Sequence, residues 1–357
     1  MPRKKRNLTF SALTRAYQRN VRSLLRATQP ARKALKKTVK PARKLPAVPR
    51  RPVPAASREL GQWIAGVATG PAGARRYHLY IPPGLLLQPQ EKLPLMVMLH
   101  GCRQTGRDLA ASSRMNRLAA RERFLVLYPE QEAMANAQGC WNWFEGRSHR
   151  AQAEATTLLA AIDKATARRP VDKSRVAVAG LSAGAGMAAL MAALYPHRFC
   201  AVAMHSGVAP GAAASAATAL AAMQGRREPQ LPQPISTAAP IGMGQALTQQ
   251  VLPPLLVVHG DKDHVVSVRN ASAAAVLWAH ALSARPSPVR KLQRGHRYAI
   301  QATDYKARGG AVVVALRTVE GLAHAWSGGA ANMPFSDPAG PDASALIWGF
   351  VARQFSK

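Results

Sequence analysis

Two patterns of apolar residues alternate from residue 75 onward, and together they predict a protein built from strands and helices in turn. Short apolar runs such as residues 95–99 (LMVML) have the length and composition of strands buried on both faces of a sheet. The predicted strands cover residues 75–81, 95–99, 124–128, 175–179, 201–205, 255–259, 298–304 and 311–319, and the predicted helices cover residues 108–121, 152–168, 184–195, 267–284 and 342–355. This order predicts an α/β fold with a mostly parallel central sheet, helices on both faces, and a functional site at the carboxyl ends of the strands.

The first 58 residues do not follow this pattern. They contain 18 Lys and Arg and no acidic residue, whereas the remainder has 31 basic and 17 acidic residues, within a formal net charge of +32. Residues 8–28 have the spacing of a basic amphipathic helix, and residues 30–54 are dense in Pro, Ala, Lys and Arg, which favours an extended linker. We therefore predict a basic, largely disordered N-terminal arm at residues 1–58 and one folded domain at residues 59–357.

The charge of the N-terminal arm has two interpretations. Its unopposed positive charge predicts a salt-sensitive attraction to a polyanion, such as nucleic acid or an anionic granule or membrane surface. The alternative is a disordered tail that only increases solubility. The sequence leaves both open.

Several classes of protein are disfavoured by composition. The arm lacks the uninterrupted apolar run of a secretory leader, and no stretch approaches the roughly 18 apolar residues of a membrane span. The three cysteines Cys102, Cys140 and Cys200 lack the paired spacing of a zinc site. We therefore expect a soluble or peripheral protein in the reducing cytoplasm, without a metal or cofactor, while a Cys102–Cys140 disulfide stays open.

Residues 209–254 interrupt the alternation of strands and helices. An Ala-rich stretch is followed by a Pro- and Gln-rich one, which predicts a helix and then an irregular excursion. This insertion is either a lid over the functional site or a surface loop, and both interpretations stay open.

The segment Gly180-Leu181-Ser182-Ala183-Gly184 stands where a predicted strand meets a predicted helix. A serine at such a turn needs small neighbours because the backbone is tight, and this arrangement is that of the nucleophile elbow of α/β-hydrolases. The helix that follows provides free N–H groups and a dipole that favour a developing anion. Ser182 is therefore the predicted nucleophile.

A serine hydroxyl needs a histidine base, which a carboxylate usually orients. In α/β-hydrolases the chain order is Ser, then Asp or Glu, then His. Asp263 follows the strand at 255–259, and His324 lies in a loop of small residues after the strand at 311–319. Asp261 is the competing carboxylate, but its place nearer the strand suits stabilisation of the turn, so we predict the triad Ser182, Asp263 and His324.

The remaining site residues are predicted from their position beside these three. The amide of Ala183, directly after the nucleophile, and the amide of Cys102, in the loop after the strand at 95–99, are the expected oxyanion-hole donors. Trp326 lies two residues after the predicted base, and Trp141 and Trp143 concentrate aromatic surface in one short segment. These tryptophans are candidates to contact substrate, although Trp141 and Trp143 fit an ordinary core equally well.

The segments HGCRQTG, GCWNWF, GLSAGAGM, MHSG, HGDKDHVV and GLAHAWSGG follow one another in an order that resembles the polyhydroxybutyrate (PHB) depolymerase family of esterases. This family is related to feruloyl and acetylxylan esterases, and the resemblance covers about residues 75–355. It implies an α/β-hydrolase catalytic domain at residues 59–357, the same triad, and an oxyanion hole bordered by the HGC segment. It also implies cleavage of carboxylic esters, in some members those of poly(3-hydroxybutyrate) or its oligomers.

The resemblance has two departures and leaves alternatives. Secreted members carry a signal peptide and often a substrate-binding domain, and the basic arm here instead predicts an intracellular enzyme. Its charge suggests residence on polyester granules or nucleoid. A feruloyl or acetylxylan esterase is the alternative enzyme, although it would require export. A peptidase of the prolyl oligopeptidase kind would need room for a further domain. From a different class, the chain could be a polyanion- or granule-binding protein on a hydrolase scaffold.

Overall fold

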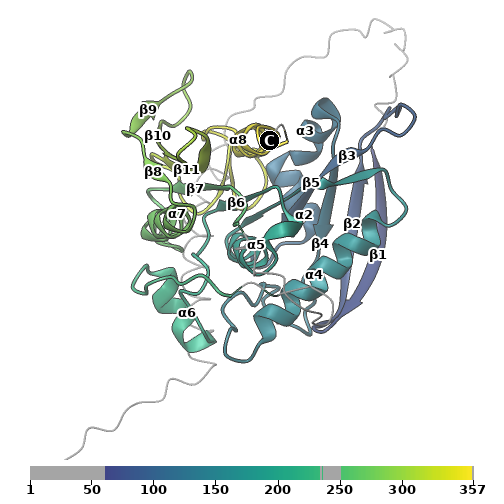
Figure 1. The fold of residues 1–357 in the computed structure, drawn as a ribbon, viewed down its shortest axis with the longest axis horizontal. Helices are drawn as coiled ribbons and strands as arrows, with labels where there is room; N and C mark the ends of the chain where they lie inside the picture. The colour runs from purple at the N-terminus through teal and green to yellow at the C-terminus, as the bar shows by residue number, and fades with distance from the viewer. Residues whose placement is uncertain (1–60, 234, 236–250, 356–357) are drawn as a thin grey trace, which may run out of the picture. The chain divides into compact units, whose positions relative to one another are not determined.

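The computed structural model describes residues 61–233, 235 and 251–355 (Figure 1). The predicted N-terminal arm and its boundary with the folded domain lie outside the described residues, as does part of the 209–254 insertion. The predictions made for these segments are therefore not addressed by the fold.

One large sheet organises the described part of the chain. Its strands are β1 (Gln62–Gly70), β2 (Gly73–Ile81), β3 (Leu93–Leu99), β4 (Leu125–Pro129), β5 (Val171–Leu181), β6 (Ala201–His205), β7 (Leu255–Gly260), β8 (Arg285–Pro286), β9 (Arg290–Leu292), β10 (Ile300–Lys306) and β11 (Val312–Val319). Their order is β1-β2-β4-β3-β5-β6-β7-β11-β10-β8, with β9 paired to β10. Neighbouring strands from β4 to β11 along this order are parallel, and antiparallel strands extend both edges. A separate short pair joins β12 (Trp326–Ser327) to β13 (Ser336–Asp337).

Helices cover both faces of the sheet. They are α2 (Gly106–Ser113), α3 (Met115–Glu122), α4 (Arg150–Thr166), α5 (Ala183–Leu194), α6 (Ala216–Met223), α7 (Arg269–Ala281) and α8 (Ala343–Ala352). One hydrophobic cluster joins α4, α5 and α7 to the sheet, and a second joins α2, α3 and α8 to its other face (Figure 1). The predicted α/β fold with a mostly parallel central sheet is confirmed.

Most of the central parallel strands are buried along their whole length, as their apolar sequences require. Every residue of β3, β6 and β7 is buried, because helices exclude water from both faces of the sheet. Since β5, β6, β7 and β11 run parallel, their carboxyl ends meet at one edge. The loops that leave this edge carry the predicted site residues.

The prediction of one continuous helix at residues 108–121 is wrong, because the structure has two helices there. Arg114 adopts a left-handed conformation (φ 57°) and separates α2 from α3. The break frees two carbonyl groups for distant partners: that of Ser112 accepts the N–H of Ala330 at 2.8 Å, and that of Ser113 accepts the hydroxyl of Ser344 at 2.7 Å. The helix is therefore interrupted where the loops near the C-terminus dock.

The edges and the insertion differ from the prediction in smaller ways. Strand β1 is partly exposed and was not predicted, and β8 and β9 are exposed two- and three-residue segments. The insertion begins in the core, since Ala209 and Ala212 are at most 1% exposed, and its predicted helix is α6. Whether the segment acts as a lid stays a prediction.

Candidate active site

Ser182 occupies a strained turn between β5 and α5. Its backbone has φ 57° and ψ −118°, a conformation that residues other than glycine rarely adopt. Two glycines give this turn its clearance. A Cβ atom on Gly180 would lie 2.3 Å from the carbonyl carbon of Gly184, and one on Gly184 would lie 2.1 Å from the carbonyl oxygen of Leu99. Only glycine fits at these positions, and the resulting strand-to-helix turn leaves Ser182 partly exposed at the carboxyl end of β5.

Asp263 and His324, far apart in the chain, form a direct pair. His324 Nδ1 lies 2.7 Å from Asp263 Oδ2, and the two side chains are 7% and 0% exposed. The other carboxylate oxygen accepts the N–H groups of Val265 and Val266, each at 2.9 Å. His259 Nε2 lies 3.4 Å from Asp263 Oδ2. Every oxygen of this buried carboxylate therefore has polar partners that hold it in place.

The surroundings of Asp263 keep its carboxyl group ionised. Burial by itself raises the pKa of Asp263, but the charge of His324 and the hydrogen bonds of His259 and His324 outweigh it and hold this pKa well below its usual range. An ionised carboxylate at this position can fix the tautomer of an imidazole and stabilise its protonated form. The pair therefore has the arrangement of a general base, the imidazole of His324, beside an anion, the carboxylate of Asp263.

Asp261 has the structural role that its position suggested. Its Oδ1 accepts the N–H of Gly321 at 2.7 Å, and the N–H of the next residue, Lys262, donates to the carbonyl oxygen of Leu322 at 3.1 Å. A Cβ atom on Gly260 would lie only 2.0 Å from that same carbonyl oxygen. The loop after β7 is therefore clamped directly against the His324 loop, which we define as residues 320–325 between β11 and β12.

Ser182 and His324 are connected through His205 at the end of β6. The carbonyl oxygen of His205 accepts the N–H of Ser182 at 2.9 Å, and its Nε2 accepts the N–H of Ser327, three residues after His324, at 3.1 Å. Among the hydrogen bonds between described residues, His324 makes the one to Asp263 through Nδ1 and none to the Ser182 hydroxyl. Catalytic hydrogen bonds are often long until substrate binds, so the absence of this bond does not exclude His324 as the base of Ser182.

Ala183 directly follows Ser182, and the loop that carries Cys102 lies close to it. Ala183 is the first residue of α5, where backbone N–H groups lack partners within the helix. Gly101 lies close to the nucleophile, because a Cβ atom there would be 3.6 Å from the Cβ of Ser182. The N–H of the next residue, Cys102, donates to no other residue that the structure describes. The two amides proposed for the oxyanion hole therefore remain available for that role.

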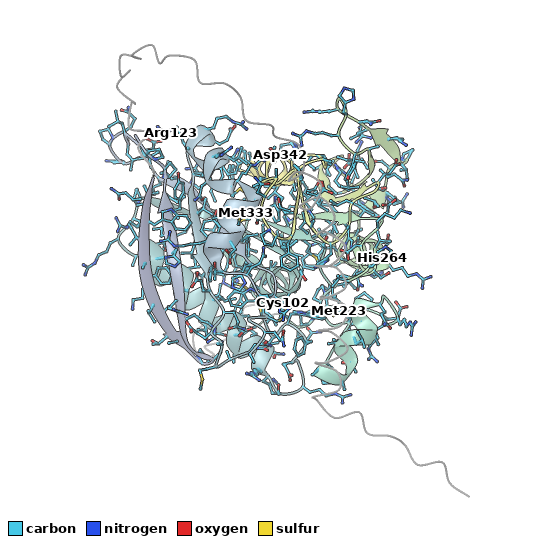
Figure 2. All side chains as sticks on the ribbon, turned by 180° about the vertical axis from the view of Figure 1, so that it is seen from behind. Cys102, Arg123, Met223, His264, Met333 and Asp342 are labelled. Carbon is cyan, nitrogen blue, oxygen red and sulfur yellow. A yellow bond between two sulfur atoms is a disulfide. The ribbon has the colours of Figure 1, made fainter. Side chains whose placement is uncertain are left out.

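A disulfide joins Cys102 to Cys140, which answers the question that the sequence left open (Figure 2). It ties the loop after β3 to the aromatic segment, and the N–H of Arg103 reinforces this connection by donating to the carbonyl oxygen of Gln138 at 3.0 Å. Disulfides persist mainly in oxidising compartments. A disulfide is unusual in the reducing cytoplasm predicted from the small number of cysteines, and that location stays a prediction.

Two of the three candidate substrate tryptophans are core residues. Trp141 and Trp326 have no exposed surface, and each indole N–H has an internal acceptor: the carbonyl of His100 at 3.0 Å for Trp141, and the hydroxyl of Ser344 at 3.3 Å for Trp326. Complete burial with a satisfied N–H is incompatible with substrate contact in this conformation. The predicted contact role of these two residues is therefore corrected to a structural one.

Trp143 differs from the other two because it is only half-buried. It packs on α5 one turn beyond the nucleophile, where a Cβ atom on Gly186 would lie 3.1 Å from the Trp143 ring. It meets Phe144 edge to face at 5.4 Å, and both pack on a small buried cluster that contains Val208 and Val266. Trp143 is thus the tryptophan that borders the candidate site with surface left to offer.

Three buried histidines stand at the ends of apolar strands, and sequence reasoning gave them no role. His100, His205 and His259 are at most 1% exposed. His100 Nε2 accepts the N–H of Gln131 at 3.1 Å, and His259 Nε2 lies 2.9 Å from the carbonyl oxygen of Val266. Burial lowers the pKa of His100, and burial together with the neighbouring histidines lowers the pKa of His205 to about 3. The available signal was a histidine closing each apolar run: LMVMLH, AVAMH and LLVVH.

Neither a metal site nor a membrane span is found among the residues that the structure describes. No group of three or more His, Cys, Asp or Glu side chains there is arranged to hold a metal ion. In the same part of the chain, no helix combines the length and the apolar character needed to cross a bilayer.

The sheet order, the strained serine turn and the buried pair beyond it place this chain among the α/β-hydrolases. More narrowly, it belongs to the esterase PHB depolymerase family, whose model matches residues 75–280. The family resemblance predicted from the sequence is thereby confirmed.

Known relatives are esterases and a depolymerase. The chain is 30% identical over 268 residues to poly(3-hydroxyalkanoate) depolymerase C of Paucimonas lemoignei, a match that covers 73% of this chain and 60% of that protein. It is 33% identical over 160 residues to feruloyl esterase B of Neurospora crassa, covering 44% of this chain and 52% of that one. The acetyl xylan esterase from Aspergillus awamori has a similar fold, with a TM-score of 0.57, 20% identity, and coverage of 74% and 93% of the two chains. This chain thus spans only about half to three fifths of the first two relatives.

Proposed function

We propose that this protein is a serine-dependent carboxylic ester hydrolase that forms an acyl-enzyme intermediate on Ser182. The observation that carries the proposal is the buried Asp263–His324 pair, joined at 2.7 Å at the sheet edge where the strained Ser182 turn also lies. Membership of an esterase family supports the same reaction class.

The reaction follows from the roles of these groups. His324 Nε2 removes the proton of the Ser182 hydroxyl as its oxygen attacks the ester carbonyl, and Asp263 stabilises the imidazolium that forms. The amides of Ala183 and Cys102 donate to the oxyanion of the tetrahedral intermediate. His324 then protonates the departing alcohol, and a water molecule activated by the same imidazole releases the acid.

For the substrate, we propose poly(3-hydroxybutyrate) or short hydroxyalkanoate oligomers. The support is the similarity to a poly(3-hydroxyalkanoate) depolymerase, together with the half-buried indole of Trp143 and its apolar neighbour Phe144, which suit an aliphatic acyl chain. A feruloyl or acetylxylan-type esterase is the alternative enzyme. The feruloyl esterase relative and the disulfide favour it over a peptidase or a binding protein on a hydrolase scaffold.

Covalent labelling tests the reaction class, and parallel assays test the substrate. A fluorophosphonate should label the wild-type protein and leave Ser182→Ala unlabelled; the absence of labelling from both would contradict the serine mechanism and favour a binding protein on a hydrolase scaffold. Release of product from p-nitrophenyl butyrate, 3-hydroxybutyrate oligomers and methyl ferulate should be greatest for the hydroxybutyrate oligomers. A higher kcat/KM for methyl ferulate would instead establish the alternative esterase.

For the partner of residues 1–58, we propose a polyanion, either nucleic acid or an anionic granule or membrane surface. The support is charge alone: 18 basic residues with no acid among them. Deletion of residues 1–58 should lower the salt concentration at which the protein elutes from heparin and abolish binding to DNA or granules. Equal binding by the full chain and the deletion variant would contradict this proposal.

A further inference from the structure

His205 lies between the two loops on which the proposed reaction depends. Its backbone accepts the N–H of Ser182, and its ring accepts the N–H of Ser327, so one residue of β6 contacts both the nucleophile turn and the segment after His324. The ring is completely buried and stacks on Trp326, with centroids 5.0 Å apart and planes inclined by 21°. It therefore cannot reach substrate, and any role in the reaction must act through other residues.

The hydrogen bonds of the ring define its tautomer. Because Nε2 accepts an amide N–H, the proton of the neutral imidazole is on Nδ1, which lies 3.1 Å from the hydroxyl oxygen of Ser206. Ser206 is itself held by its N–H, which donates to the carbonyl oxygen of Val258 in β7 at 2.9 Å. The ring is thus fixed in plane by one donor and one acceptor contact, on a residue whose neighbour is anchored in the sheet.

The His324 loop has glycine or alanine at three of its six positions and an anchor at each end. Upstream, the carboxylate of Asp261 binds the N–H of Gly321. Downstream, β12 is held by the N–H of Trp326, which donates to the carbonyl oxygen of Phe335 at 2.7 Å, and by the bond from Ser327 to His205. The upstream anchor connects the loop to the Asp263 side of the site, and His205 alone among these contacts connects it to the strand pair that carries Ser182.

We infer that His205 is a positioning residue that sets the distance between His324 and Ser182 by binding the backbone on both sides of the pair. This inference rests on the proposed serine mechanism and deepens it. Misplacement of reacting groups by about 1 Å can cost on the order of 10²-fold in rate, so loss of the ring acceptor should lower kcat rather than weaken substrate binding.

The decisive comparison is between His205→Phe and His205→Gln in the full chain. Phenylalanine preserves the stacking on Trp326 but removes the acceptor for Ser327, whereas the glutamine side-chain oxygen can restore an acceptor near the Nε2 position. With p-nitrophenyl butyrate, His205→Phe should lower kcat by roughly 10- to 100-fold with KM changed less than about threefold, and His205→Gln should recover most of the loss. The rate of fluorophosphonate labelling should change in the same proportion as kcat.

Thr157→Val is the matched control for general destabilisation. The Thr157 hydroxyl accepts the N–H of Ala72 at 2.9 Å in the turn between β1 and β2, so its removal also deprives one backbone N–H of its acceptor, on elements that carry no site residue. This variant should lower the melting temperature without changing kcat. A common fall of kcat in Thr157→Val and His205→Phe would overturn the inference, because destabilisation would then account for both.

The failures of the two proposals are distinguishable. If wild type is labelled at Ser182 and His205→Phe is labelled equally fast while folded, the positioning role is overturned and the serine mechanism stands. If His205→Gln is as slow as His205→Phe, the hydrogen bond to Ser327 is not what positions the base, and the inference again fails. A wild type that does not react at all overturns the proposed function and the positioning role together.

Discussion

The buried carboxylate of Glu154 should be a main determinant of stability near the candidate site. Its oxygens accept from Arg75 Nη2 at 2.8 Å, Gln131 Nε2 at 2.7 Å, and the backbone and side-chain nitrogens of Asn142 at 2.6 and 3.2 Å. Glu154 lies on α4, whereas its partners come from β2 and from the loop that leads to Trp143. One carboxylate therefore joins the sheet edge to the loop that borders the site.

Replacement of Glu154 by leucine leaves a buried cation without its anion. The side chains of Arg75 and Glu154 are 3% and 0% exposed, so water cannot take the place of the carboxylate. Removal of one partner from a buried ion pair typically costs about 3–5 kcal/mol, which is a large part of the roughly 5–15 kcal/mol that stabilises a folded domain. We expect urea denaturation of Glu154→Leu to show a loss of free energy of unfolding in that range, with the slope against urea unchanged.

A double variant separates the uncompensated charge from the other contacts. Arg75→Met combined with Glu154→Leu removes both ions, and it should recover about 1–3 kcal/mol relative to Glu154→Leu alone. Recovery should be incomplete because Gln131 and Asn142 still lack their acceptor. A loss below about 1 kcal/mol in the single variant, or a double variant that is less stable than the single one, would refute the reasoning.

Three further changes probe other contacts of the site. Asp263→Asn should lower kcat for p-nitrophenyl butyrate on the order of 10⁴-fold, because an amide does not hold the required tautomer of His324; a loss below about tenfold would exclude Asp263 from the triad. Reduction of Cys102–Cys140, which closes a loop of 38 residues, should lower the free energy of unfolding by up to about 4 kcal/mol in melts with and without thiol, and Cys200→Ser should keep this sensitivity because Cys200 is a free cysteine. Because the pKa of His205 is about 3 in the folded protein and near 6.5 when unfolded, its contribution to stability is complete above pH 6.5 and is lost as pH falls towards 3, by about 1.4 kcal/mol per unit. Urea unfolding at several pH values should show that the free energy of unfolding falls less steeply with decreasing pH in His205→Gln than in the wild type. The same pH dependence in both proteins would contradict a lowered pKa of His205 in the folded state.

The parallel strands and the turn at Ser182 could be predicted because both depend on local sequence. Strands buried on both faces require uninterrupted apolar runs, and the prediction for residues 201–205 coincides with β6, while that for residues 184–195 differs from α5 by one residue at each end. The turn at Ser182 is equally local, since its glycines and the flanking apolar runs lie within a few positions of one another.

Features decided by distant contacts could not be predicted from the sequence. At the break between α2 and α3, the carbonyl of Ser113 accepts the hydroxyl of Ser344, which lies 231 positions away in the sequence. Trp141 is buried because its indole reaches the carbonyl of His100, 41 positions earlier, and aromatic content alone does not distinguish such a residue from a pocket wall. The same holds for His205 and Ser327, which lie 122 positions apart.

These distant contacts explain how the short His324 loop can hold the proposed base in place. The close approach of this loop to β7 depends on Gly260, because a Cβ atom there would lie 2.0 Å from the carbonyl oxygen of Leu322. Gly321 gives the loop itself backbone freedom rather than rigidity. Its geometry is therefore imposed from outside, by the carboxylate of Asp261 on one side and by the ring of His205 on the other. A buried neutral imidazole suits this task because it offers one donor and one acceptor in a single plane. A chain that kept Ser182, Asp263 and His324 but lost these two supports would carry the reacting groups on loops too loose to align them.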